Sequence, residues 1–210
     1  MEILIMLILA SKNSDVAEFS KYFLQPPERT KVLRVTTAGR DVPDATYLER
    51  GMEDWTQLGI ELTDYDIKGK DQDEIRQALK GKNAVFVAGG NGFHLLKAIR
   101  ESGFEEVVRE FLDQGGTYIG ASSGAYVAGP SIEQHALLKP EWNTVGLTDF
   151  TAMKLVPFMV KCHATKEKLS RYRELFKNLK HPIRFLQDGQ FFVVNREGKV
   201  ERHGQGVELQ

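Results

Sequence analysis

Residues 120–124, Gly-Ala-Ser-Ser-Gly, match the pattern Gly-x-Ser-x-Gly, in which a serine occupies a sharp turn between a strand and a helix. Glycines flank such a serine because side chains there would collide with the neighbouring backbone. Ser122, at the centre, is the candidate nucleophile. The N–H of Ser123 is a candidate oxyanion donor, helped by the positive end of the following helix. The alternative is a plain strand-to-helix turn of small residues.

A second donor to the same oxyanion is expected from another loop, and the segment Gly89-Gly90-Asn91 follows an apolar run at 84–88. Glycine lets the backbone approach a bound carbonyl closely, so Gly90 is the candidate donor and Asn91 a candidate substrate-binding side chain. The competing interpretation is a nucleotide phosphate loop. The segment lacks the Lys-Ser/Thr of a Walker loop and the third glycine of a dinucleotide fingerprint.

A serine hydroxyl needs a base within hydrogen-bond reach. His163 follows the apolar run 155–162, so the end of a strand would deliver it to the site. The other histidines lie in a predicted helix, in an irregular connection, before a proline and in the polar tail: His94, His135, His181 and His203. Cys162 precedes His163, but neighbouring side chains of an extended segment point to opposite faces, so we expect a small buried residue there.

These residues must be positioned by alternating strands and helices, which imply an α/β fold with a mostly parallel central sheet. Strands are expected at 3–10, 32–37, 60–67, 84–88, 117–119 and 155–162, with a small antiparallel finish from short strands at 183–186, 190–194 and 199–202. Helices are expected at 14–22, 44–58, 71–79, 93–100, 104–112, 125–128 and 166–179. Residues 133–150 are expected to form a long irregular connection within a single domain of residues 1–210.

Composition excludes several classes of protein. The 28 Lys and Arg balance 29 Asp and Glu, so nothing draws the chain to nucleic acid or to anionic membranes. Cys162 is the single cysteine, which rules out an internal disulfide and a thiolate zinc cage and favours a reducing, cytoplasmic setting. The apolar start is expected to be a buried strand rather than a signal peptide, because it has no positive n-region.

Three segments together resemble the peptidase E (α-aspartyl dipeptidase) family, which includes cyanophycinase-like members. They are residues 85–96, 118–125 and the stretch from Val156-Pro157-Phe158 to His163, and Asp188-Gly189-Gln190 also matches. The resemblance implies a class I glutamine-amidotransferase-like three-layer sandwich with helices on both faces of the sheet, in which serine replaces the usual cysteine. It also implies hydrolysis next to an N-terminal aspartate, without metal or organic cofactor. Carried over, Ser122 is the nucleophile, His163 the base, and Gly90 with Ser123 the oxyanion donors.

The chain departs from the family where the acid of the triad is expected. Dipeptidase members have an Asp a few residues past Pro130-Ser131-Ile132, and the corresponding residue here is Leu137. Glu133 is the nearest carboxylate and our predicted acid, with Glu141 and Asp149 further along. A solvated loop glutamate is the alternative interpretation of Glu133.

An aspartyl substrate needs a cation for its carboxylate, and Arg171 and Arg173 on the helix after His163 are candidates. Either arginine could equally be part of a solvated helix face. The expected partner is a small peptide, with a homodimer as an assembly that the sequence permits. Two alternative functions stay open. One is a non-catalytic member of the fold that binds a small ligand, and the other is an esterase or amidase.

Overall fold

The computed structural model describes residues 6–39, 49 and 52–206. The strands are β1 (Met6–Ala10), β2 (Lys31–Val35), β3 (Glu61–Tyr65), β4 (Ala84–Val87), β5 (Thr117–Ala121), β6 (Met159–Lys161), β7 (Ile183–Phe185), β8 (Gln190–Val194) and β9 (Val200–Gly204). The helices are α1 (Val16–Phe19), α3 (Met52–Gln57), α4 (Gln72–Leu79), α5 (Gly92–Ser102), α6 (Phe104–Asp113), α7 (Ser123–Ala128), α8 (Glu133–Leu138) and α9 (Lys166–Phe176).

Seven strands form the main sheet in the order β3-β2-β4-β5-β1-β8-β9. The first five in that order run parallel, whereas β8 pairs antiparallel with β1 and β9 antiparallel with β8. The predicted mostly parallel sheet with an antiparallel C-terminal addition is confirmed. Because β8 runs against the others, its first residues reach the edge of the sheet at which the parallel strands end.

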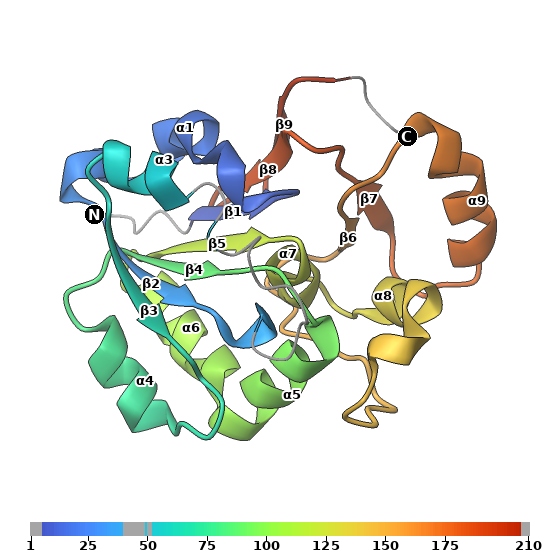
Figure 1. The fold of residues 1–210 in the computed structure, drawn as a ribbon, viewed down its shortest axis with the longest axis horizontal. Coiled ribbons are helices and arrows are strands. Elements are labelled where there is room, and N and C mark those ends of the chain that lie inside the picture. Colours follow the sequence, from blue (N-terminus) through green and yellow to red (C-terminus); the bar gives the residue numbers. More distant parts are fainter. Residues whose placement is uncertain (1–5, 40–48, 50–51, 207–210) are drawn as a thin grey trace.

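Helices cover both faces of the sheet, with α1 and α3 on one side and α4, α5 and α6 on the other (Figure 1). Successive residues of β1 therefore enter two different cores: Leu7 and Leu9 pack with α5 and α6, while Ile8 and Ala10 pack with α1 and α3. Burial on both faces explains why this strand is apolar throughout instead of alternating.

The second half of the chain differs from the prediction in two places. The strand expected at 155–162 is only the three-residue β6, and it pairs in parallel with β7 in a separate two-stranded sheet. β7 is therefore not part of the antiparallel addition, because α9 forms the connection that a parallel pair requires. Residues 133–150, expected to be irregular, contain α8 and a short 3₁₀ turn at Pro140–Trp142.

Two predicted elements extend beyond the described residues. Residues 3–5 of the first strand and residues 44–48 and 50–51 of the second predicted helix lie outside them. Within the described part of the chain, no helix has the length and apolar character needed to span a membrane.

Candidate active site

Four neighbouring strands bring the chemistry-bearing residues to one edge of the sheet. β4, β5 and β1 run in parallel and end just before Gly89, Ser122 and Ser11. The antiparallel β8 begins at the same edge, just after Asp188. Ligands of open parallel sheets bind outside the carboxyl ends of the strands, so this edge is the expected place for a site.

Ser122 lies in a strained backbone conformation at the turn between β5 and α7. Its φ of 52° and ψ of −112° are rare for a residue with a side chain. The Ser122 N–H donates to the Ala10 carbonyl at 3.1 Å, which anchors the turn to β1. Strain of this kind costs about 1–3 kcal/mol and persists only where the surroundings impose it.

The glycines around the turn are required by close backbone approaches. A Cβ on Gly124 would lie 2.0 Å from the Val87 carbonyl oxygen of β4. A Cβ on Gly89 would lie 2.9 Å from the Cβ of Ser122. Both loops can therefore meet beside Ser122 only because these positions lack side chains.

Gly90 and Ser123, the predicted donors, are linked directly. The Ser123 hydroxyl donates to the Gly90 carbonyl at 2.5 Å, which joins the loop after β4 to the start of α7. Ser123 is the first residue of α7, so its N–H has no acceptor inside that helix. The two predicted donors therefore lie on adjoining loops beside Ser122.

His163 meets Ser122 from the small second sheet. It follows β6 by two positions, and its Nε2 lies 3.3 Å from Ser122 Oγ, across 41 residues of sequence. Its φ of 56° makes it, with Ser122 and Lys154, one of three non-glycine residues with positive φ in the described chain. Two of the three strained residues are thus the predicted nucleophile and base.

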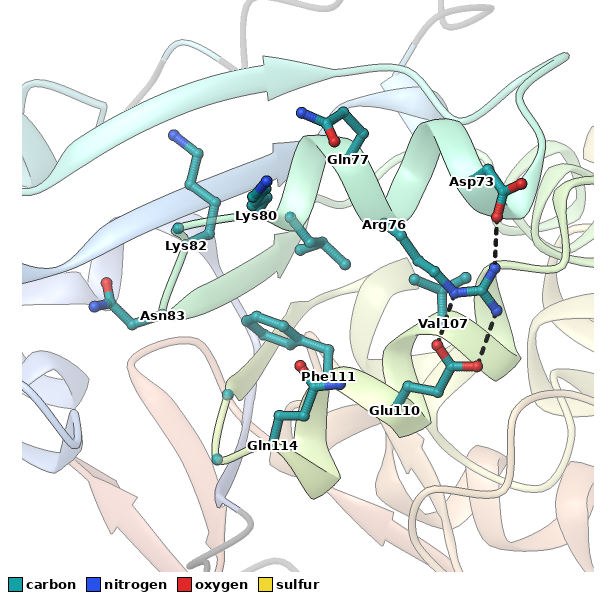
Figure 2. A pocket seen from close by; sticks show the side chains of 14 residues that line it. Asp73, Arg76, Gln77, Lys80, Lys82, Asn83, Val107, Glu110, Phe111 and Gln114 are labelled. Atoms are coloured by element: carbon teal, nitrogen blue, oxygen red, sulfur yellow. Dashed lines mark hydrogen bonds and ion pairs between the residues drawn. The ribbon is translucent and has the colours of Figure 1, made fainter.

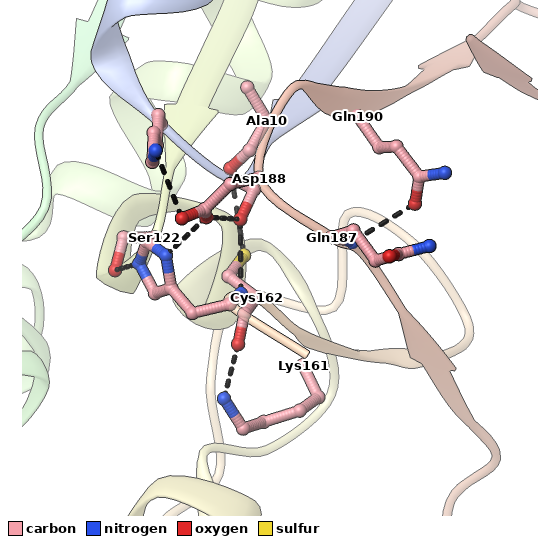
Figure 3. A network of polar contacts seen from close by, with 10 residues as sticks. Ala10, Ser122, Lys161, Cys162, Gln187, Asp188 and Gln190 are labelled. Carbon is pink, nitrogen blue, oxygen red and sulfur yellow. Dashed lines mark hydrogen bonds and ion pairs between the residues drawn. The ribbon is translucent and has the colours of Figure 1, made fainter. Parts of the chain in front are cut away.

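Asp188 completes a hydrogen-bonded chain behind the imidazole. Its Oδ1 lies 2.6 Å from His163 Nδ1 and also accepts from the Ser11 hydroxyl at 2.9 Å. Its Oδ2 pairs with Lys12 at 3.0 Å. Figure 3 shows the Asp188 carboxylate between these contacts, with Ser122 nearby. Partial burial raises the pKa of Asp188, but the bonds to Lys12, His163 and Ser11 outweigh it and leave the pKa below its usual value.

Asp188, rather than the predicted Glu133, is the carboxylate at His163. Glu133 begins α8, and its Oε2 accepts from the Ser131 hydroxyl at 3.3 Å. Of the other carboxylates considered, Asp149 pairs with Arg100 and Glu141 with Lys139. The sequence did not single out Asp188 because it lies 25 residues beyond the histidine, and the matching segment Asp188-Gly189-Gln190 indicated no role for it.

Ser11 connects the two partners of the imidazole. Its hydroxyl accepts from the backbone N–H of His163 at 3.0 Å and donates to Asp188 Oδ1 at 2.9 Å. The Ser11 side chain is fully buried. One hydroxyl therefore holds both the strained backbone of His163 and the carboxylate that faces its ring.

We expect Ser11→Ala to lower kcat about 10- to 100-fold with KM nearly unchanged, because hydrogen bonds to charged groups contribute about 1.5–3 kcal/mol. Steady-state kinetics with a substrate that acylates Ser122 would measure this. Lys12→Ala is the comparison, since its exposed ion pair with Asp188 should contribute less. An Ser11→Ala protein with unaltered kcat would show that the hydroxyl does not position the pair.

The three predicted substrate-binding residues have different environments. The Asn91 side chain caps α5 by accepting from the N–H groups of Phe93 and His94, and its amide nitrogen donates to the Trp142 carbonyl at 2.9 Å. Asn91 is therefore engaged within the protein at both ends of its amide, which argues against its predicted role. Arg171 lines a cavity beside Ser122, whereas Arg173 is exposed and does not line it.

Cys162 is buried, as expected for a small structural residue. Its thiol lies 3.6 Å from the Ala10 carbonyl, and burial raises its pKa to about 12. The thiolate needed for nucleophilic chemistry is therefore absent at neutral pH. His135, expected in an irregular connection, lies buried in α8 instead.

Two cavities meet at Ser122 and His163. One of about 380 Å³ is lined by Ser11 to Ser14 and Gly89, and the other, of about 500 Å³, extends toward α8 and α9. A larger cavity of about 620 Å³ lies between α4 and α6, at the opposite end of the strands (Figure 2). In this cavity the Arg76 guanidinium already forms ion pairs with Asp73 and Glu110, so its charge is balanced within the protein.

The arrangement can perform acyl transfer. A hydroxyl, an imidazole and a carboxylate are hydrogen-bonded in series, beside two loops that can present backbone N–H groups to an oxyanion. The three parts come from unrelated places in the sequence, which is how this constellation recurs on different folds.

Comparisons with known proteins agree with this geometry. The model of peptidase family S51 matches residues 6–201. An uncharacterised peptidase of Pasteurella multocida (strain Pm70) is 26% identical over 200 residues, which cover 93% of this chain and 96% of that protein. Peptidase E of Shewanella amazonensis is 31% identical over 131 residues, 61% of this chain and 51% of that protein.

The fold is also that of a solved structure. The crystal structure of a protein from Listeria monocytogenes EGD-e, described as a peptidase E protein, superposes with a TM-score of 0.83 and 23% identity, covering 97% of this chain and all of that one. A peptidase from an acI-B1 Actinobacterium superposes with a TM-score of 0.73 and 15% identity, covering 98% and 90%. Because the family model matches nearly the whole chain, the protein belongs to peptidase family S51, the serine-type peptidases that include peptidase E.

Proposed function

We propose that this peptidase is a dipeptidase-like enzyme that removes an N-terminal aspartate from small peptides through an acyl-enzyme on Ser122. The observation that supports the mechanism most strongly is the continuous series of contacts from Ser122 Oγ through the His163 ring to Asp188. The preference for aspartate is supported by the cavity of about 500 Å³ beside Ser122, whose lining includes Arg171 and no carboxylate from the described residues.

In the proposed reaction, Ser122 Oγ attacks the peptide carbonyl while His163 Nε2 takes the hydroxyl proton. The resulting oxyanion accepts hydrogen bonds from the N–H groups of Gly90 and Ser123. Collapse of the tetrahedral intermediate breaks the C–N bond, and the leaving amine receives the proton from His163. Water then attacks the acyl-enzyme, with His163 as base, and releases the acid and free Ser122.

Asp188 acts in this scheme by orienting the imidazole. A hydrogen bond from Nδ1–H to the carboxylate fixes the tautomer in which Nε2 is free to accept the proton of Ser122. The carboxylate also stabilises the imidazolium that forms during attack. With Asp188 in this place, the leucine at position 137 no longer argues for a non-catalytic, ligand-binding member of the fold.

Two measurements test the proposal together. A fluorophosphonate probe should label the native protein at Ser122, as located by peptide mass spectrometry, because only an activated serine reacts readily. The dipeptide Asp-Leu should be hydrolysed with a kcat/KM at least about tenfold above that of the near-isosteric Asn-Leu. Absence of labelling would refute the acyl-enzyme mechanism, and equal rates on both dipeptides would refute the aspartate preference. Labelling without hydrolysis of either dipeptide would favour an esterase or amidase.

A further inference from the structure

The cavity of about 500 Å³ has a buried polar floor that the proposed chemistry does not use. Lys161, Gln134 and His135 line it together with Ser122 and His163. All three are at most 8% exposed, although each carries a polar side chain. Burial of polar groups is costly unless they are hydrogen-bonded, so such a floor calls for a partner.

Lys161 is a buried lysine, and burial lowers the pKa of its amine. It is 6% exposed, its Nζ donates to the Cys162 carbonyl, and it lies 5.0 Å from the centre of the Tyr172 ring. No carboxylate of the described residues is within ion-pair distance of this ammonium. Figure 3 shows the side chain extending away from Asp188, on the far side of Cys162. A ligand carboxylate would supply the missing charge.

Gln134, which lines the same cavity, has an acceptor atom that no described residue uses. Its amide nitrogen donates to the Val160 carbonyl at 2.9 Å, which fixes the orientation of the amide. The Oε1 atom is left buried, and no donor to it is found in the described part of the chain. Because Val160 directly precedes Lys161, the acceptor and the cation belong to neighbouring parts of the same cavity floor.

His135 completes the floor as a neutral group. Burial lowers the pKa of its imidazole to about 4, so the ring is uncharged at neutral pH. Its Nε2 is likewise buried without a partner among the described residues. The floor therefore offers one positive charge and neutral hydrogen-bonding atoms, which suit a ligand that carries both a carboxylate and an ammonium group.

We propose that Lys161 and Gln134 recognise the charged head of the substrate's acyl residue, with Lys161 binding its carboxylate and Gln134 Oε1 accepting from its ammonium group. This inference rests on the proposed function and names the residues that would provide its specificity. The cavity is also lined by Gly90 and Ser123, so a carbonyl held between those loops would extend its acyl side into the cavity.

The chemistry of this head is that of an N-terminal aspartyl residue. Such a residue carries an ammonium group and a side-chain carboxylate around its reacting α-carbonyl. The exposed Lys168 and Arg171 at the cavity mouth increase the positive potential that attracts such acids. Lys168 and Arg171 are exposed, whereas the buried Lys161 is the residue that binds the substrate carboxylate in this proposal.

Binding of free amino acids tests the head-group site without depending on catalysis. We would titrate L-aspartate, L-asparagine and N-acetyl-L-aspartate into the Ser122→Ala protein by isothermal calorimetry. L-Asparagine lacks the side-chain carboxylate and the acetylated ligand lacks the ammonium group. L-Aspartate is expected to bind at least tenfold more tightly than either, and equal affinities for L-aspartate and L-asparagine would overturn the proposal.

Variants of Lys161 and Gln134, each made in the Ser122→Ala background, test which residue binds the carboxylate and which binds the ammonium group. Lys161→Met should weaken L-aspartate at least tenfold and leave L-asparagine within threefold. Lys166→Met is the matched control, since this exposed lysine of α9 does not line the cavity. Gln134→Met should weaken both free amino acids and leave N-acetyl-L-aspartate within threefold. Equal losses for all ligands in Lys161→Met would show a structural role instead.

A further variant covers the case in which these substitutions impair folding. Gln134→Glu adds a negative charge to the cavity floor that Lys161 also lines, and it should abolish binding of L-aspartate while thermal melting shows an intact fold. Unchanged affinity in this folded variant would overturn the proposal.

Hydrolysis by the native enzyme then relates the head-group site to the proposed function. Asp-Leu places the side-chain carboxylate beside the reacting carbonyl, whereas β-aspartyl-leucine and γ-glutamyl-leucine carry only an α-carboxylate in their acyl residue and should be hydrolysed more slowly. Selective binding of L-aspartate without hydrolysis of any of them would refute the proposed function and leave the head-group site standing. Hydrolysis without selective binding would refute the head-group site alone.

Discussion

Replacing Ser122 by alanine is expected to lower kcat by about 10⁶-fold on an aspartyl dipeptide, the loss seen when a serine nucleophile is removed from a complete triad. The reason is the loss of the only oxygen that His163 Nε2 approaches, at 3.3 Å, in the described site. The residual rate would come from the oxyanion donors and from substrate binding. Single-turnover kinetics with a discontinuous product assay would detect the residual rate.

Ser122→Gly is the matched control, because it removes the same oxygen and also the backbone strain. Glycine adopts the φ of 52° and ψ of −112° at little cost, so the free energy of unfolding should rise by about 1 kcal/mol relative to Ser122→Ala. Denaturant titration would measure it. If both variants are inactive and Ser122→Gly is the more stable, the backbone at position 122 is strained independently of the serine side chain. Substantial activity in either would remove Ser122 from the mechanism.

Replacing Asp188 by alanine is expected to lower kcat by about 10⁴-fold, close to the effect of removing the acid of a serine-peptidase triad. Without this carboxylate, Nδ1 of His163 loses its partner at 2.6 Å, and neither the tautomer nor the orientation of the ring is fixed. KM should change far less than kcat, because Asp188 does not line either cavity beside Ser122. Pre-steady-state kinetics would locate the loss in the acylation step.

Glu133→Gln is the control for Asp188, since it removes the carboxylate that the sequence favoured. Its Oε2 contacts the Ser131 hydroxyl, so we expect kcat within about twofold of the native value. The opposite result would be a large loss of kcat in Glu133→Gln and little loss in Asp188→Ala. It would mean that Glu133 replaces Asp188 as the partner of His163 when substrate binds.

The position of Asp188 follows from strand direction. β1 lies between β5 and β8, so Ser11 and Ser122 extend from parallel strands while Asp188 enters an antiparallel one. All three therefore meet at one edge, although the acid precedes its strand and the others follow theirs. His163 arrives from outside the main sheet, on the segment that follows β6.

The local parts of the site could be predicted from the sequence. Gly120 and Gly124 beside Ser122 indicate the sharp turn, and the glycines after the apolar run 84–88 indicate a loop of bare backbone, although the close approach of these two segments is tertiary. The continuous apolar runs likewise predicted a parallel sheet covered on both faces, because a strand buried twice has no polar side. His163 could be selected because it follows an apolar run and no other histidine does.

Only the tertiary structure decided which carboxylate serves the histidine and which side chains form the cavity. No periodicity links Asp188 to His163, since their contact depends on how β8 pairs with β1. In the sequence, Lys161 is a polar residue within an apolar run, and Gln134 lies in a segment expected to be a loop. Both are buried in the structure because α8 packs against β6. Short-range sterics act between near neighbours in the chain, whereas charge pairing across a fold is set by the topology that brings distant segments together.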